Sequence, residues 1–152
     1  MGLKDLQDEL ARLHRICIDT AVFAYHLAEH PRYVAYTSAI LGAVEQKKLE
    51  GVITTITLTE LLTYPAQKGD AETMREWELY LTNFPNMLIV PLDLPLAREA
   101  ALVRGETRLK TPDAVQVAAA RLNGADAILT NDRPWARRIS APRVLVLDDF
   151  VS

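Results

Sequence analysis

The chain has 152 residues, 49% of them hydrophobic and 24% charged, and its formal net charge is −3. This composition is typical of a soluble globular domain that is long enough to bury a core, and it excludes intrinsic disorder. No apolar run approaches the roughly 20 residues that cross a bilayer, the N-terminus lacks a secretory signal pattern, and the small negative charge predicts that any binding of nucleic acid depends on a local site.

The first predicted element is a helix near the N-terminus. Its apolar residues recur at a spacing that places them on one helical face, at Leu3, Leu6, Leu10 and Leu13. We expect residues 1–15 to form a helical extension that packs on the main domain at 16–152, and a partner-binding helix is the alternative. The single cysteine, Cys17, cannot form an internal disulfide, which fits a reducing, cytoplasmic location.

Short apolar runs alternate with helical patterns along the rest of the chain. Such alternation, with β-branched residues in the runs, indicates a parallel sheet that is covered by helices on both faces. The predicted strands are Ile16–Ile18, Val52–Thr55, Met87–Val90, Ala127–Thr130 and Arg143–Leu147. The predicted helices span about 22–29, 33–49, 58–64, 70–83, 95–106, 112–123 and 134–139. No glycine-rich phosphate loop interrupts this pattern.

Acidic residues stand at or near the beginning of four of these helices. Asp19 directly follows the first strand, and Asp132 follows the fourth strand after one residue. The second strand leads to Glu60, and Asp113 begins the helix at 112–123. Since ligands gather at the carboxyl ends of parallel strands, we expect these four carboxylates to converge at one edge of the sheet.

Each acid also has a purely structural interpretation. Asp19 and Asp132 have the positions of N-caps, which accept hydrogen bonds from the first backbone amides of a helix. Thr57 and Glu60 have the spacing of a capping box, and Asp113 suits the positive end of a helix dipole. Capping can explain any one of these acids. It does not readily explain why all four acids are predicted at the same edge of the sheet.

Convergence of the acids would favour a metal ion. Carboxylates within about 4–6 Å of one another repel, and a divalent cation removes that repulsion. Their oxygens are ligands that Mg²⁺ prefers, with Mn²⁺ as a substitute, whereas His14, His26 and His30 lack partners at zinc-ligand spacing. A carboxylate-bound Mg²⁺ suits phosphodiester hydrolysis, because it lowers the pKa of a bound water and neutralises charge on the phosphate.

Four segments together resemble the PIN-domain family, and most closely the VapC-type toxin ribonucleases of toxin–antitoxin systems. In order along the chain they are ICIDT (16–20), TITLTEL (55–61), TPDAVQVAAA (111–120) and LTND (129–132). The resemblance covers about residues 16–150. It implies a three-layer α/β/α fold with a five-stranded parallel sheet, a Mg²⁺-dependent endoribonuclease acting on RNA, a cognate antitoxin and a homodimer.

The resemblance also implies roles for individual residues. It carries the catalytic and metal-binding roles of the family to Asp19, Glu60, Asp113 and Asp132. Thr130 and Asn131 match small polar residues that support the fourth acid. Two features depart from the family: Ala21 stands where the family often has Ser or Asn, and the first 15 residues precede the usual start of VapC-like chains.

Several residues near the acids are candidates for binding the substrate. Lys110, Arg133 and Arg137 neighbour the acids and are expected to contact phosphates, with a solvated charged face as the alternative. Three tyrosines could stack on unpaired bases or pack in the core, and these are Tyr25, Tyr33 and Tyr36. Gln116 shares a helical face with Asp113 and could orient it, or could make an ordinary polar contact.

Two other functions compete with RNA cleavage. One is a PIN-like scaffold that binds RNA or a partner without cutting, which Ala21 and the N-terminal extension leave open. The other is a phosphoacceptor receiver domain, which also carries acids at strand ends. A receiver needs paired acids after the first strand, where Asp19 stands alone, and a lysine after the last strand, where Asp148 and Asp149 stand instead.

Overall fold

The computed structural model describes all 152 residues, which form five strands, eight α-helices and a short 3-10 turn. The strands are β1 (Arg15–Ile18), β2 (Glu50–Thr54), β3 (Met87–Val90), β4 (Ala127–Thr130) and β5 (Arg143–Val146). The helices are α1 (Leu3–Leu10), α2 (Thr20–Leu27), α3 (Val34–Glu45), α4 (Thr55–Gln67), α5 (Ala71–Thr82), α6 (Leu94–Thr107), α7 (Thr111–Leu122) and α8 (Arg133–Arg138), and the turn is η1 (Leu147–Asp149). No helix combines the length and apolarity that a membrane span requires.

The five strands form one parallel sheet in the order β3-β2-β1-β4-β5, which confirms the predicted α/β fold. From β1 the chain first adds β2 and β3 on one side, and then returns to place β4 and β5 on the other. The strand order therefore reverses at β1. In open α/β sheets, such a reversal opens a crevice at the carboxyl ends of the strands, which is where ligands bind.

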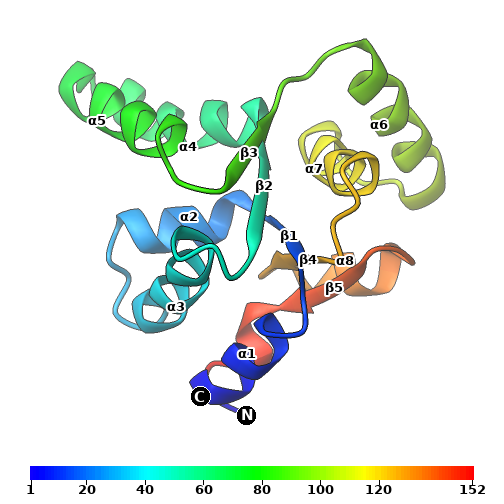
Figure 1. Cartoon of the computed structure of the whole chain (residues 1–152). Coiled ribbons are helices and arrows are strands. Elements are labelled where there is room, and N and C mark those ends of the chain that lie inside the picture. Colours follow the sequence, from blue (N-terminus) through cyan, green and yellow to red (C-terminus); the bar gives the residue numbers. More distant parts are fainter.

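Helices cover both faces of the sheet, so that the fold has three layers (Figure 1). Successive residues of the central strand point to opposite sides. Ile16 and Ile18 join a core with residues of α1, α2 and α3. Cys17 joins the other core, with residues of α6, α7 and α8. Every residue of α7 from Ala114 to Ala120 is buried, as its Ala-rich and Val-rich sequence predicts, and the helix is therefore a rigid support for its first turn.

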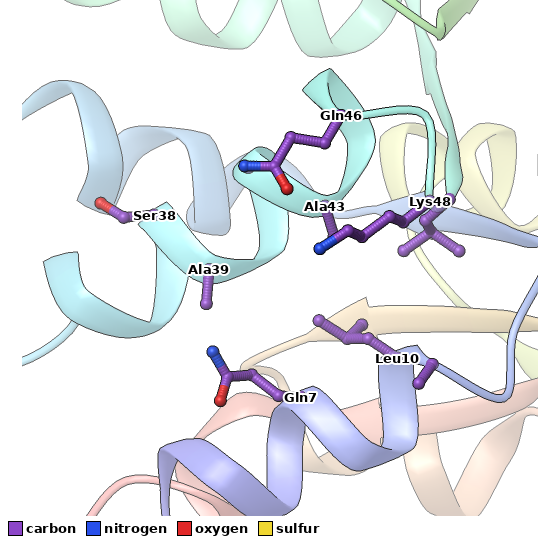
Figure 2. A pocket seen from close by; sticks show the side chains of 10 residues that line it. Gln7, Leu10, Ser38, Ala39, Ala43, Gln46 and Lys48 are labelled. Carbon is purple, nitrogen blue, oxygen red and sulfur yellow. The ribbon is translucent and has the colours of Figure 1, made fainter.

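The N-terminal helix α1 lies against α3 on the first of these faces. It ends at Leu10, and Leu6 and Leu10 are buried in the core that α2 and α3 share. Beside this contact, Gln7 of α1 and Ala43 of α3 line a hollow of about 360 Å³ (Figure 2). Apolar burial at this contact therefore packs α1, which precedes the segments that resemble the PIN-domain family, against the rest of the fold.

Several predicted helix boundaries differ from those of the structure, and two of the differences have a clear local reason. The helix predicted at 58–64 begins at Thr55, because the Thr54 hydroxyl accepts hydrogen bonds from the amides of Ile56 and Thr57. The helix predicted at 33–49 ends at Glu45, and Lys47 then adopts a left-handed backbone with φ of 62°.

The capping box of α4 is also not the predicted one. The Thr57 hydroxyl accepts a hydrogen bond from the Thr54 amide, and Thr54 in return accepts one from the amide of Thr57. The box is therefore Thr54 with Thr57, and not Thr57 with Glu60. This correction leaves the carboxylate of Glu60 without a capping role.

Candidate functional site

Asp19 lies at the carboxyl end of the central strand, at the residue before α2 begins. Its amide still donates to the Leu129 carbonyl of β4, at 2.9 Å, so that the sheet holds its backbone. The side chain caps no amide of α2 and is only 9% exposed. Instead, its Oδ2 accepts a hydrogen bond from the Thr130 hydroxyl at 2.7 Å. The capping interpretation of this aspartate is therefore wrong.

The surroundings of Asp19 disfavour its charged form. Burial raises its pKa from the ordinary value of 3.8 to about 6, against the opposing effect of the Thr130 hydrogen bond. The negative charges of Asp113 and Glu60 raise this pKa further. A buried carboxylate with two like charges close by and no cation beside it is a common sign of a functional site.

Asp113 joins the group from the first turn of α7, where it is half-buried. Burial raises its pKa, and the charges of Glu60 and Asp132 raise it further, whereas nearby Lys110 lowers it. The four predicted acids thus interact electrostatically, although they come from four separate segments of the chain. The fold places them at one edge, as the sequence pattern predicts.

Glu60 is the most completely oriented of the exposed acids. The Thr20 hydroxyl donates to its Oε1 at 2.6 Å, and the Gln116 side-chain amide donates to the same oxygen at 3.3 Å. Gln116 is 1% exposed, also approaches the Thr20 hydroxyl at 3.4 Å, and has no partner for its own Oε1. The role of Thr20 was not predicted from the sequence, although its position directly after Asp19 is a signal that it belongs to the site.

Asp132 occupies the residue before α8, but its side chain makes no capping hydrogen bond either. Its amide donates to the Thr130 hydroxyl at 3.0 Å, while that hydroxyl donates to Asp19. Thr130 therefore links the backbone of the fourth acid to the carboxylate of the first. The carboxylate of Asp132 is exposed and is available to the site.

Asn131 contacts a group of polar side chains beside the acids. Its side-chain amide donates to the hydroxyls of Tyr25 and Tyr33, both at 3.3 Å, and its Oδ1 accepts from the Asp148 amide at 2.9 Å. The two rings stack with centroids 4.2 Å apart, and the Tyr33 hydroxyl donates to Asp148 at 2.8 Å. Tyr33 is buried and Tyr36 packs against the core, so Tyr25 is the tyrosine best placed for a ligand.

An open hollow of about 510 Å³ connects these two groups. Its lining includes Asp19, Ala21, Tyr25, Asp132, Arg133 and Asp148. Arg133 also forms an ion pair with Asp149 at 2.8 Å. Of the other cations that the sequence singled out, Lys110 acts on Asp113, whereas Arg137 is exposed on α8 and does not line the hollow.

The acids match a hard divalent cation in donor type, because every side-chain donor among them is a carboxylate oxygen. Burial and the charges of Asp113 and Glu60 raise the pKa of Asp19, and a divalent cation would offset both effects. No three His, Cys, Asp or Glu side chains lie together as a group that could hold a metal ion, however. The residues therefore fit Mg²⁺ or Mn²⁺ chemically, and binding would require their side chains to turn toward one another.

Comparisons with known proteins identify the family and match the fold. The PIN domain family model matches residues 16–139. Among solved structures, "Crystal structure of VapBC2 from Rickettsia felis bound to a DNA fragment from their promoter" has 17% identity and a TM-score of 0.68, covering 87% of this chain and 98% of that one. "Toxin-antitoxin complex from Klebsiella pneumoniae" has 20% identity and a TM-score of 0.64, covering 87% and 97%. "Crystal Structure of FitAcB from Neisseria gonorrhoeae" has 20% identity and a TM-score of 0.65, with the same coverage.

No curated protein sequence matches the chain significantly. The solved structures therefore show the shared fold, and the family is shown by the model that matches most of the chain. The matched range begins at the second residue of β1 and includes the four acids at 19, 60, 113 and 132. The chain belongs to the PIN domain family.

Proposed function

We propose that this protein is a Mg²⁺-dependent endoribonuclease, with Mn²⁺ as a substitute metal, and that it is the toxin of a toxin–antitoxin pair. The observation that carries the proposal is the buried carboxylate of Asp19, whose pKa burial raises to about 6 beside Asp113 and Glu60. PIN domains are generally nucleases, and the structures matched above include a toxin–antitoxin complex from Klebsiella pneumoniae.

Each acid and its neighbours would have a distinct task. Asp19 and Asp113 would hold the metal, with Glu60 and Asp132 completing the acidic set around it. The bound metal would supply an activated water and neutralise charge on the phosphate. Hydrogen bonds from Thr130 to Asp19 and from Thr20 and Gln116 to Glu60 would limit the positions of those carboxylates at this edge of the sheet, so that only a small rotation is needed to bind the metal.

The cations would act on the substrate rather than on the metal. Lys110, whose charge lowers the pKa of Asp113, is placed to contact a phosphate near that acid. Arg133 lines the hollow, where a phosphate would compete with Asp149 for its guanidinium. We propose a cognate antitoxin and a homodimer as the protein partners, on the likeness to the toxin–antitoxin complexes alone.

The proposal is tested by incubating purified protein with single-stranded RNA in Mg²⁺, in Mn²⁺ and in a chelator. We expect cleavage with either metal and none in the chelator, and loss of cleavage in Asp113→Asn. Asp70→Asn is the matched control, since it removes one carboxylate at the cap of α5, where Asn also caps well. Cleavage that persists in Asp113→Asn, or in chelator, would overturn the proposed chemistry.

One observation favours a second function, a scaffold that binds RNA or a partner without cutting. No three potential ligands form a group that could hold a metal ion as the side chains stand. A metal-binding enzyme should nevertheless be stabilised by Mg²⁺, because a ligand that binds only the folded state raises its stability. We expect Mg²⁺ to raise the melting temperature of the parent and not that of Asp113→Asn, whereas a scaffold predicts no rise in either.

A further inference from the structure

We propose that the hollow between Asp19 and Asp148 binds the base of one nucleotide next to the bond that is cut, and that it prefers guanine. The inference rests on the proposed RNA cleavage and adds a specificity site to it. The hollow measures about 510 Å³, which is within the usual range for small-ligand sites. It begins at two of the acids, Asp19 and Asp132, so a base held there would belong to a nucleotide beside the reacting phosphate.

Asp148 is the residue that would recognise the base. Its Oδ1 accepts from the Tyr33 hydroxyl at 2.8 Å, and its amide donates to the Asn131 side chain at 2.9 Å. These two contacts hold both the backbone and the carboxylate. Arg32 also forms an ion pair with Oδ1, at 3.9 Å, and the Asp148 side chain is 31% exposed. The other carboxylate oxygen, Oδ2, accepts no hydrogen bond from the chain, and Asp148 lines the hollow, so this residue offers a held acceptor to a ligand there.

The chemistry of this acceptor selects among the four bases. A carboxylate can only accept hydrogen bonds, and it pairs best with two adjacent donors, one on each oxygen. Oδ1 of Asp148 would accept the second donor through the lone pair that the Tyr33 hydroxyl leaves free. On its Watson–Crick edge, guanine presents adjacent N1–H and N2–H donors. Adenine and cytosine place an acceptor nitrogen next to their amino groups, and uracil places its single N–H between two carbonyls. Unpaired RNA bases expose this edge to proteins, so Asp148 would favour guanine.

Tyr25 and Ala21 would form the surface beneath the base. They are four residues apart on α2 and therefore share one helical face, and both line the hollow. Stacking on Tyr33 and the hydrogen bond from Asn131 hold the Tyr25 ring in place. Sequence-tolerant stacking on an aromatic ring supplies affinity, and the small side chain of Ala21 leaves room beside it.

The charges along the hollow suit a nucleotide whose phosphate lies beside Arg133 and whose base lies beside Asp148. Arg133 provides a cation for a phosphate, near Asp132. Asp148 provides the negative charge that base N–H donors prefer. A basic side chain of a partner protein could also pair with Asp148, and the experiment below distinguishes the two, because only a nucleotide site changes base preference when Asp148 is replaced.

The first experiment maps cleavage in a randomised single-stranded RNA pool by sequencing product ends. We expect guanine enriched at one position flanking the cut for the parent. Asp148→Asn should lower that enrichment roughly tenfold and shift it toward adenine or cytosine, because Asn offers one donor and one acceptor. Asp70→Asn, the control at the cap of α5, should keep guanine, because Asp70 does not line the hollow. Equal base use by the parent, or unchanged guanine preference in Asp148→Asn, would overturn the inference.

A second experiment separates this inference from the proposed cleavage. In chelator, binding of labelled short RNAs of alternating sequence is measured by fluorescence anisotropy, comparing UG, UI, UA and UC repeats. We expect the UG repeat to bind roughly tenfold more tightly than the UI repeat, since inosine lacks the N2 amino group. The comparison needs no variant, so it also decides the matter if Asp148→Asn misfolds. Guanine-selective binding without cleavage would reject only the nuclease, and equal binding would reject the base site.

Discussion

Two aspartates at opposite ends of the same sheet show how differently the fold can treat one kind of side chain. Asp126 lies just before β4, and its Oδ2 accepts from the amides of His14 and Arg15 at 2.7 and 3.0 Å. These hydrogen bonds hold the pKa of Asp126 below its usual range. Asp19 lies just after β1, and burial with neighbouring carboxylates raises its pKa to about 6.

The difference separates a structural carboxylate from a candidate functional one. The backbone satisfies the negative charge of Asp126, which ties the loop before β1 to the start of β4. Burial and like-charged neighbours raise the pKa of Asp19 more than the Thr130 hydroxyl and the Thr20 backbone lower it, so the fold bears a cost for keeping it charged at neutral pH. Such a cost is expected where a site is arranged for binding or catalysis rather than for stability.

The largest expected effect is on cleavage. Asp19→Asn should lower the rate of Mg²⁺-dependent RNA cleavage roughly 100-fold or more, because the site loses a charged metal ligand while Asn can still accept from Thr130. The rate is measured on labelled RNA by gel. Asp126→Asn, the same change at the opposite end, should cleave like the parent at temperatures where it is folded. An equal loss of cleavage rate in both variants would contradict the assignment of Asp19 as functional and Asp126 as structural.

The pH dependence of stability should also distinguish them. The folded chain keeps a proton on Asp19 up to about pH 6, whereas an unperturbed carboxyl loses it near 3.8. The stability that Asp19 contributes is therefore complete below the lower value and is lost as the pH rises through the upper one, by roughly 3 kcal/mol.

The measurement compares urea unfolding of the parent and of Asp19→Asn between about pH 4 and 8. The stability of the variant relative to the parent should grow as the pH rises through 6, because Asn does not ionise. A difference between the two proteins that stays constant with pH would contradict the raised pKa of Asp19. Titrating groups that do not interact with Asp19 contribute equally to both proteins and cancel in this comparison.

Replacing Gln116 tests whether the hydrogen bonds that orient Glu60 contribute to catalysis. Gln116→Leu should lower kcat roughly tenfold and leave KM nearly unchanged, since Glu60 loses one of its two donors while the substrate surface is intact. Stability should not fall, because the change also removes a buried oxygen without a partner. Unchanged kcat, or a loss explained by unfolding in circular dichroism, would reject a positioning role.

The smallest expected effect concerns the structural aspartate. Asp126→Ala should lower the free energy of unfolding by about 1 kcal/mol, because two backbone amides lose their shared acceptor at a largely solvated position. Denaturant unfolding measures this loss. Cleavage per folded molecule should stay at the parental level, and a drop in it would show that the two ends of the sheet are coupled.

The sequence alone predicted the five strands, the parallel sheet and the four acids at its carboxyl edge. This succeeded because β-branched runs, helical periodicity and residues next to strand ends are local features. Local patterns failed at the caps. Thr54 and not Thr57 begins the capping box of α4, and neither Asp19 nor Asp132 caps its helix through its side chain.

Only the tertiary structure decided what surrounds each acid. Thr130 contacts Asp19 across 111 residues, Gln116 reaches Glu60 across 56, and Asp148 meets Asn131 across 17. Hydrogen bonds, burial and mutual repulsion depend on distances in space, which spacing along the chain does not specify. The sequence therefore determined which charged groups reach the edge of the sheet, and packing determined which of them is buried, which is oriented and which remains open to a ligand.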